Sequence, residues 1–281
     1  MKAASRAEQA GPPLFVISGM PSGGTTYLCA VLHNPPRVVT VSEAGGGWKQ
    51  RARERGRDPG LVQELFDYRE RVLAGERIPS LEETEGFEGK RRVDTWNQKK
   101  TLRRHRVDPS FSLGMKQPEV FLELLGFFLD AGLKCVLSVR HPVYVINSWV
   151  KRSRRHLERK GNLRGIFANG ESVLYSSVKP DIVDRRIELY NHMAARVAAH
   201  MDHEDVMVVR YEEWFTDDDL LDKVSGFIGV PNLGYLRPPL IPPDPLLLEA
   251  REQERILAGC AEAAALGYEA DGTRLLAPVR P

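Results

Sequence analysis

Short apolar runs alternate along the chain with longer segments in which apolar and polar residues are mixed. The runs are rich in valine, isoleucine and leucine, and each is followed by serine or arginine. Runs of this length and composition are typical of strands that are covered on both faces. We therefore predict buried strands at 14–17, 38–41, 134–139 and 206–209.

The mixed segments show the spacing of apolar residues that is typical of helices. Helices are expected at 26–32, 61–73, 119–131, 143–155, 182–201, 220–228 and 246–266. Strands that alternate with helices form parallel sheets, because each helix carries the chain back to the start of the next strand. The pattern predicts an α/β sandwich with a mostly parallel central sheet, formed by residues 1–281 as a single domain.

Three segments interrupt this alternation. Residues 1–12 contain no apolar run and are expected to be a flexible N-terminus. Segments 48–112 and 161–181 are polar, and we expect them to be variable insertions on the substrate side of the sheet, since ligands bind at the carboxyl ends of parallel strands. The first contains a basic run at 90–106, which is either part of that surface or a solvated helix face.

The composition narrows the class of protein. The 281 residues include 40 Lys and Arg against 38 Asp and Glu, so the net charge of +2 gives no reason to expect nucleic acid as a partner. Cys29, Cys135 and Cys260 lie far apart, which suggests neither a zinc site nor a disulfide and fits a reducing cytoplasm. No apolar leader and no long apolar run is present, so we expect a cytoplasmic protein that does not enter a membrane.

A glycine-rich segment, GMPSGGTT at 19–26, separates the first predicted strand from the first predicted helix. Successive N–H groups of such a loop can surround a phosphate, and the helix N-terminus adds partial positive charge. The spacing is that of a P-loop, except that Thr25 stands where the P-loop has its lysine. Because that lysine contacts the phosphates of ATP, and no strand ends in an aspartate for magnesium, phosphoryl transfer from ATP is disfavoured.

The sequence MPSGGTTYL resembles the first loop of the sulfotransferases that use 3′-phosphoadenosine 5′-phosphosulfate (PAPS). It keeps the proline, the second glycine and both threonines of that loop. The resemblance implies a P-loop-type three-layer α/β/α sandwich, PAPS as donor and PAP as product. It also implies that the donor is bound by Pro21, Ser22, Gly23, Gly24, Thr25 and Thr26.

A second block, KCVLSVRHPVYVINSWVKR, resembles the 3′-phosphate block of the same family. There a buried strand ends in Arg-Asp-Pro and a serine follows eight residues after the arginine. The matching residues are Arg140 and Ser148, with His141 in place of the aspartate. An arginine at a strand end and a serine on the next helix can converge on one phosphate. Arg152, one turn beyond Ser148, shares its helix face and is a third candidate.

Two further blocks resemble the family at lower specificity. VVRYEEW at 208–214 is similar to its strand-end Tyr-Glu block, and LGY at 266–268 is similar to its carboxyl-terminal helix end. The first block adds Tyr211 to the candidate nucleotide-binding residues. Adenine needs an aromatic or apolar slot, and the sequence does not choose among Trp48, Tyr211, Trp214 and Phe227.

The largest departure from the family is Ser22, which stands where the family has a lysine or arginine. That cation neutralises charge on the bridging oxygen of the donor, whereas a serine donates only a hydrogen bond. LGMKQPEVF resembles a Lys-x-Pro block of tyrosylprotein-type and bacterial sulfotransferases, which implies that Lys116 supplies the cation. The alternative is a solvent-facing lysine on a turn.

The resemblance also implies a general base, which takes the proton of the acceptor. Glu43, which follows the second predicted strand, matches the glutamate that serves as base in the tyrosylprotein enzymes. His105 is the alternative base, and Glu43 is otherwise a helix-capping or salt-bridged residue.

These residues predict an enzyme that transfers the sulfuryl group of PAPS to a hydroxyl group, or less favourably to an amine. The acceptor is expected to be a small molecule or a carbohydrate, and no metal is required. Two rival functions are a kinase-like P-loop phosphotransferase and a catalytically degenerate sulfotransferase-fold binding protein. The protein is expected to be a monomer or a homodimer.

Overall fold

The computed structural model describes residues 14–42, 58, 60–81, 83–85, 91–93, 100–160, 176–230 and 246–268. Of the expected site residues, Glu43 lies outside these ranges. Trp48, the expected flexible N-terminus at 1–12 and most of the segment 161–181 lie outside them as well.

Five parallel strands form the central sheet, in the spatial order β2-β7-β1-β8-β9. They are β1 (Leu14–Gly19), β2 (Val38–Ser42), β7 (Ser112–Lys116), β8 (Lys134–Val139) and β9 (Val206–Arg210). Four of them confirm predicted strands. The fifth, β7, was not predicted, and it forms because its backbone pairs with β1 on one side and with β2 on the other. Since all five strands are parallel, their carboxyl ends lie at the same edge of the sheet.

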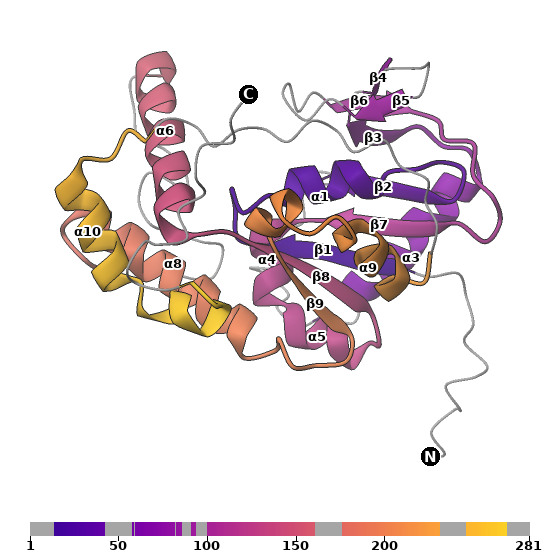
Figure 1. Ribbon diagram of the computed structural model, residues 1–281. Coiled ribbons are helices and arrows are strands. Elements are labelled where there is room, and N and C mark those ends of the chain that lie inside the picture. Colours follow the sequence, from indigo (N-terminus) through magenta and orange to yellow (C-terminus); the bar gives the residue numbers. More distant parts are fainter. Residues whose placement is uncertain are drawn as a thin grey trace.

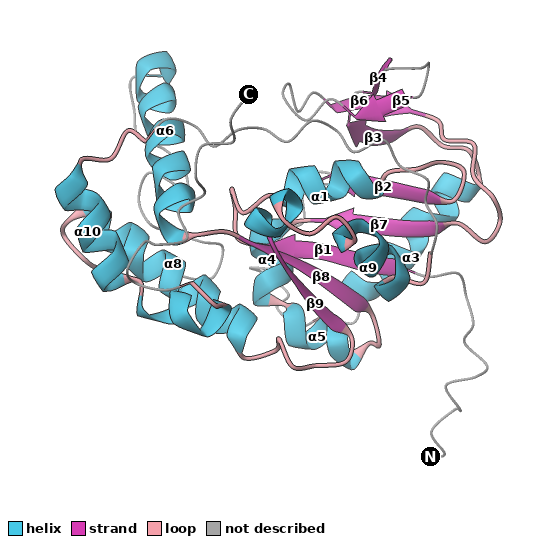
Figure 2. Cartoon of the chain, viewed as in Figure 1, coloured by secondary structure: helices cyan, strands magenta, loops and turns pink. Residues whose placement is uncertain are grey.

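Helices cover both faces of this sheet, which confirms the three-layer α/β/α sandwich (Figures 1 and 2). Successive side chains of a strand point to opposite faces. Phe15 and Ile17 accordingly pack with α1 (Thr25–Leu32) and α9 (Leu220–Phe227), whereas Val16 belongs to the core on the other face.

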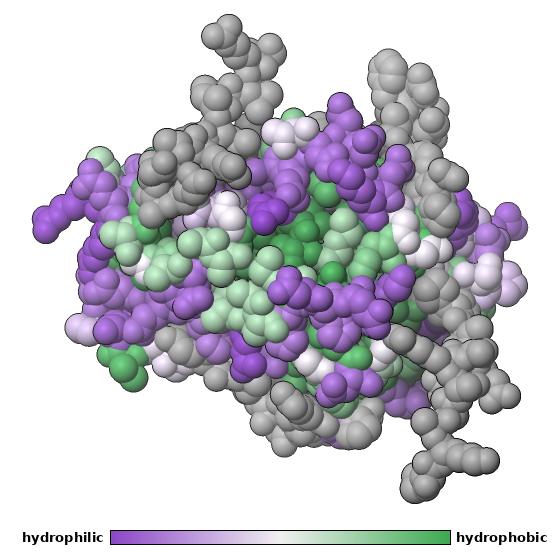
Figure 3. Space-filling model, turned by 60° about the horizontal axis from the view of Figure 1, so that its bottom comes forward, coloured by the Kyte–Doolittle hydropathy of each residue, from purple (hydrophilic) through white to green (hydrophobic). Residues whose placement is uncertain are grey.

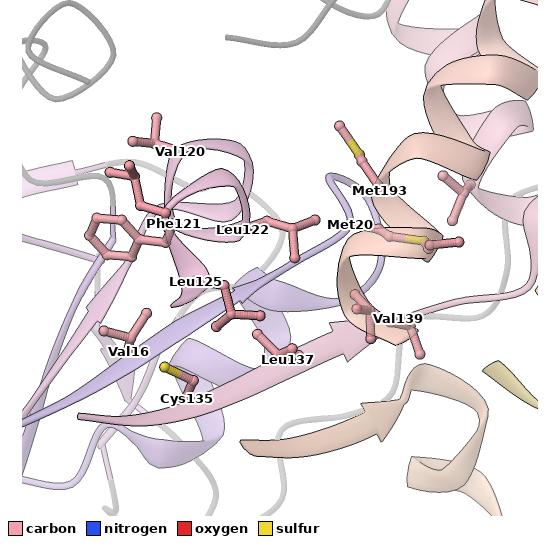
Figure 4. Packing of buried hydrophobic residues seen from close by; sticks show 14 of the residues in the cluster. Val16, Met20, Val120, Phe121, Leu122, Leu125, Cys135, Leu137, Val139 and Met193 are labelled. Atoms are coloured by element: carbon pink, nitrogen blue, oxygen red, sulfur yellow. The ribbon is translucent and has the colours of Figure 1, made fainter. Parts of the chain in front are cut away.

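The larger core lies between the sheet and α4 (Pro118–Glu123), α5 (Leu125–Asp130) and α8 (Ile182–Ala198). The helix expected at 119–131 is present in two pieces, which meet at Leu124. Figure 4 shows how strand and helix side chains interdigitate in this core. The members that it labels include Val16, Met20, Phe121, Leu125, Cys135, Leu137 and Met193.

The segment 48–112 contains a helix and two short antiparallel ribbons in its described part. The helix α3 (Gly60–Leu73) confirms the prediction at 61–73 and buries Leu61, Leu65 and Val72 in the larger core. The ribbons pair β3 (Ile78–Leu81) with β6 (Lys100–Arg103), and β4 (Glu83–Glu85) with β5 (Arg91–Val93). Strand β3 contacts β2, so the ribbon of β3 and β6 lies beside the edge of the central sheet (Figure 1).

Helices α6 (Pro142–Lys160), α8 and α10 (Ala250–Gly259) pack against one another beside the carboxyl end of the sheet (Figure 1). The helix expected at 246–266 is shorter than predicted, because α10 ends at Gly259 and a 3-10 helix, η3 (Ala261–Leu266), follows. A Cβ atom on Gly259 would lie 2.9 Å from Ile187 of α8. The glycine therefore allows the close approach of α10 to α8.

The surface seen in Figure 3 has hydrophobic residues in its middle and hydrophilic residues around most of them. In the described ranges no helix is long and apolar enough to cross a bilayer. All three cysteines, in α1, in β8 and directly after α10, are buried free thiols.

Candidate functional site

The loop between β1 and α1 runs against the end of β8. Gly19 adopts a φ of +120°, and a Cβ atom there would lie 2.0 Å from the carbonyl oxygen of Ser138. No other residue fits this approach, which is completed when the N–H of Met20 donates to the same carbonyl at 3.0 Å. The first turn of the loop is thus fixed by a neighbouring strand.

Side chains from three other elements hold the rest of the loop. The Ser138 hydroxyl donates to the carbonyl of Gly23 at 2.6 Å, and the indole N–H of Trp149 on α6 donates to the carbonyl of Pro21 at 3.0 Å. Gly24, the N-cap of α1, has a φ of +98°, and a Cβ atom there would meet the Tyr211 ring at 2.4 Å. Contacts within the protein therefore hold the loop in this conformation.

Ser22 lies in the middle of the loop, and its backbone conformation is unusual. Its φ of +69° lies in the left-handed region that few residues other than glycine adopt. Its hydroxyl oxygen is buried and has no hydrogen-bond partner in the described chain. Because an unsatisfied buried hydroxyl is costly, the loop is suited to a ligand that completes it.

Lys116 is the last residue of β7 and lies beside the loop. Its side chain is buried, with 4% of the residue exposed, and its ammonium donates to the Thr26 hydroxyl at 3.0 Å and to the Ser42 hydroxyl at 3.2 Å. The alternative of a solvent-facing lysine is therefore wrong. The lysine brings a positive charge to the first turn of α1, where the helix already presents unpaired N–H groups.

Arg140 follows β8 on the other side of β1. Its guanidinium lies 4.6 Å from the centre of the Tyr211 ring and 5.2 Å from that of Tyr144, which are cation–π distances. Its Nε atom is buried without a hydrogen-bond partner in the described chain. Burial raises the pKa of both tyrosines above the ordinary value, so both rings are neutral at pH 7.

Arg140 and Tyr211, which the sequence places in one candidate site, lie against each other, and Tyr211 also lies against the loop. Tyr211 packs under Gly24 and against Arg140. Ser148 and Arg152 lie further along α6, which begins at Pro142, and Ser148 is about 9 Å along the helix axis from that start. Ser148 is half-buried and Arg152 is exposed.

Sequence reasoning missed one acidic residue that ties the site together. Glu212 accepts a hydrogen bond from the backbone N–H of His141 at 3.1 Å and another from the Tyr268 hydroxyl at 2.8 Å. Glu212 and Tyr268 belong to the YEEW and LGY blocks, which the sequence singled out without assigning these two residues a role. The sequence therefore marked both blocks, but only the structure shows that these two side chains contact each other.

His141 lies in the same cluster and is almost completely enclosed. Its ring is 1% exposed, neither ring nitrogen has a hydrogen-bond partner in the described chain, and the rings of Tyr144 and Tyr268 meet it edge-on. Burial, assisted by the charge of Arg140, lowers the pKa of His141 to about 4. The imidazole is therefore neutral at pH 7.

These contacts describe a site for a strongly anionic ligand. The loop ends at the N-terminus of α1, where backbone N–H groups can bind an anion. Cations come from the strands on both sides of β1: Lys116 of β7 contacts Thr26, and Arg140 after β8 contacts Tyr211, which lies against Gly24. Two separate cations suit a ligand with two separate anionic groups. The described residues include no group of three His, Cys, Asp or Glu side chains that could hold a metal ion.

The chain matches no known protein-family model and no curated protein. Solved structures that are similar to it include a sulfotransferase of Alicyclobacillus acidocaldarius, with 16% identity, a TM-score of 0.49, and coverage of 92% of this chain and 94% of that one. A mouse sulfotransferase complexed with PAP has 14% identity and a TM-score of 0.35, over 89% of this chain and 64% of that one. A sulfotransferase of Mycobacterium avium has 13% identity and a TM-score of 0.39, and the match covers 80% of this chain and 66% of that one.

Proposed function

We propose that the protein is a sulfotransferase that uses PAPS as donor and releases PAP. The acceptor group is a hydroxyl, or less favourably an amine, on a small molecule or carbohydrate. The observation that carries the proposal is the buried ammonium of Lys116, held 3.0 Å from the hydroxyl of Thr26. It supplies a cation to a loop in which Ser22 stands where the sulfotransferases have a lysine or arginine.

The residues fit a doubly anionic nucleotide. Ser22 Oγ and Arg140 Nε are buried polar atoms without a partner in the described chain, and a bound anion would satisfy both. The loop would hold the phosphosulfate end, and Arg140 with Ser148 would hold the 3′-phosphate, joined by Arg152. Tyr211 packs against Arg140 and the loop, so its role here is to support both anion-binding groups and not to stack on adenine.

PAPS, when bound, supplies an activated sulfuryl group. Lys116 and the N–H groups of the loop would stabilise the negative charge that develops on the bridging oxygen as the bond to sulfur breaks. The threonines complete this cradle, since Thr26 already holds the ammonium and Thr25 is buried beside it. The protein therefore separates charge stabilisation at Lys116 from phosphate recognition at Arg140.

Proton removal is assigned to Glu43. It directly follows Ser42, whose hydroxyl accepts from Lys116 at 3.2 Å, so its position in the chain is adjacent to the proposed sulfate end of the site. Glu43 takes the proton of the acceptor hydroxyl as the new oxygen–sulfur bond forms. His105 is the second candidate base; it is buried, and its ring lies 5.1 Å from that of His33.

The test is calorimetric titration with PAP and, separately, with ATP and magnesium. Tight binding of PAP without metal is expected, and Arg140→Ala should raise its dissociation constant by about 10- to 100-fold, because a charged hydrogen-bonding partner of the phosphate is lost. Arg71→Ala is the matched control, since Arg71 is an exposed arginine on α3 paired with Glu76. Transfer of radiolabelled sulfate to a panel of hydroxyl acceptors follows.

Two results would redirect the assignment. Preference for ATP with magnesium would favour a kinase-like phosphotransferase. Binding of PAP without sulfuryl transfer to any acceptor of the panel would favour a catalytically degenerate binding protein.

A further inference from the structure

The helix that follows Arg140 begins without a side-chain cap of its own. Helix α6 starts at Pro142, so His141 stands at the N-cap position, where Ser, Thr, Asp or Asn usually accepts an N–H of the first turn. Neither ring nitrogen of His141 has a hydrogen-bond partner in the described chain. A carboxylate nevertheless lies at this helix start, and it comes from another element.

That carboxylate belongs to Glu212, in the 3-10 helix η2 (Tyr211–Phe215) that follows β9. One of its oxygens accepts the backbone N–H of His141 at 3.1 Å, and the other accepts the hydroxyl of Tyr268 at 2.8 Å. A negative charge at a helix N-terminus is stabilising. Tyr268 in turn holds the carboxylate in one orientation.

The same peptide group is held from its other side as well. The N–H that Glu212 accepts belongs to the peptide that joins Arg140 to His141, and the carbonyl of that peptide accepts the Tyr190 hydroxyl at 3.2 Å. Both polar atoms of the peptide are thereby fixed by side chains from η2 and α8. The ring of Tyr211, the neighbour of Glu212 in the chain, lies against the guanidinium of Arg140.

We propose that Glu212 is a positioning residue of the nucleotide site, which orients Arg140 toward the 3′-phosphate by fixing the peptide between Arg140 and His141. Glu212 does not touch the nucleotide itself. The inference rests on the proposed binding of PAP at Arg140. Tyr190 is the second part of the same device, since it holds the opposite side of the peptide.

The first test compares Glu212→Gln with Glu213→Gln in PAP titrations. Glu213 is the matched control, because it is the next residue of η2 and pairs with Arg210 and not with the Arg140 turn. Glu212→Gln should weaken PAP binding about fivefold to twentyfold, and Glu213→Gln should change it less than twofold. Equal PAP affinity in Glu212→Gln and in the unaltered protein would overturn the inference.

The decisive experiment is a double-mutant cycle with Arg140→Lys, in which PAP affinities are compared. It distinguishes an effect of Glu212 through Arg140 from a merely structural effect. If Glu212 acts through the guanidinium, Glu212→Gln should cost PAP affinity in the presence of Arg140 but less than twofold when Arg140→Lys is already present. Losses that multiply in the double variant would overturn the inference. Tyr190→Phe repeats the cycle from the other side of the peptide, and it decides the question if Glu212→Gln fails to fold.

This outcome is separable from that of the proposed function. If the unaltered protein does not bind PAP, the proposed function fails. If it binds PAP and the cycle is additive, only the role of Glu212 fails.

Discussion

The two cations of the site are held by different kinds of partner. Lys116 is held by the hydroxyls of Thr26 and Ser42, which leave little freedom to a buried ammonium. The guanidinium of Arg140 lies at cation–π distance from two aromatic rings, and its Nε atom is buried without a hydrogen-bond partner in the described chain. Lys116 therefore acts as a fixed point charge, and Arg140 as a directional donor.

Removal of the Lys116 charge should abolish most of the sulfuryl transfer. We expect Lys116→Met to lower kcat about 100-fold or more, because a preorganised donor at the developing charge is lost. The fold should persist, since methionine suits a buried site of this length. Initial rates at saturating PAPS, with Lys223→Met as the control at an exposed lysine, measure the effect. A kcat within threefold of the unaltered protein would remove Lys116 from the mechanism.

We expect the free energy of unfolding to fall in acid because of His141. Its pKa is about 4 in the folded protein, below the ordinary 6.5, so the unfolded chain binds the proton first as the pH falls. The stability that the neutral His141 contributes is fully present above pH 6.5 and is lost as the pH falls toward 4. By pH 5 the free energy of unfolding has decreased by about 2 kcal/mol through this residue. Urea unfolding at pH 7 and pH 5 measures it. In His141→Gln the loss between the two pH values should be smaller by that amount, and an unchanged loss would show that His141 does not titrate in this range.

At the scale of elements, the end of β1 lies very close to β8. Because the Cβ position of Gly19 lies 2.0 Å from a backbone oxygen, any side chain there must push the two strands apart. Gly19→Ala should destabilise the protein by about 3 kcal/mol or more and also impair PAP binding. Gly226→Ala in α9 is the control, because it meets nothing within 4 Å, and it should stabilise by about 0.5 to 1 kcal/mol. Equal effects in urea unfolding would contradict the prediction.

The order of strands and helices was largely predictable from the hydrophobic pattern, and the exception has a physical cause. Strand β7 escaped prediction because Gly114 interrupts its apolar run. A Cβ atom there would lie 2.4 Å from the ring of Phe15 on β1. Glycine is therefore needed at this position, because the Phe15 ring occupies the space of a side chain. Local sequence carries no sign of such packing between strands.

The sequence can point to a candidate site residue where one residue type carries the chemistry in a local pattern. The loop, Arg140 and Lys116 belong to that class. Glu212 does not, because its partners His141 and Tyr268 lie 71 and 56 residues away in the chain. The role of such a residue can be recognised only in the folded structure, where the end of β9 lies beside the end of η3.

At the scale of the whole molecule, every strand of the central sheet contributes to the site at its carboxyl end. The last residue of each strand, or the next, is one of the two cations, belongs to the loop, or contacts the loop or a cation. These residues are Ser42, Lys116, Gly19, Arg140 and Tyr211. Parallel strands with β1 at the centre make this convergence possible, since a reversed strand would place its end at the opposite edge.

Because the site draws on all five strands, PAP should stabilise the entire fold. At a PAP concentration 100 times its dissociation constant the gain is about 2.7 kcal/mol. For a domain of this size that corresponds to a rise in Tm of about 5 °C. Scanning calorimetry should show this rise in the unaltered protein, and a much smaller one in Arg140→Ala at the same PAP concentration. An equal rise with ATP and magnesium would instead favour the kinase-like alternative.

The three buried thiols mark three different layers of the molecule. Cys29 lies in α1 on one face of the sheet, Cys135 in the sheet itself, and Cys260 beside α8 and α10. Burial raises the pKa of Cys135 and of Cys260 to about 12, so neither reacts with alkylating reagents while it is enclosed. The rate at which each thiol is labelled therefore measures how often its layer opens. If one layer opens independently of the others, its cysteine should react before the other two.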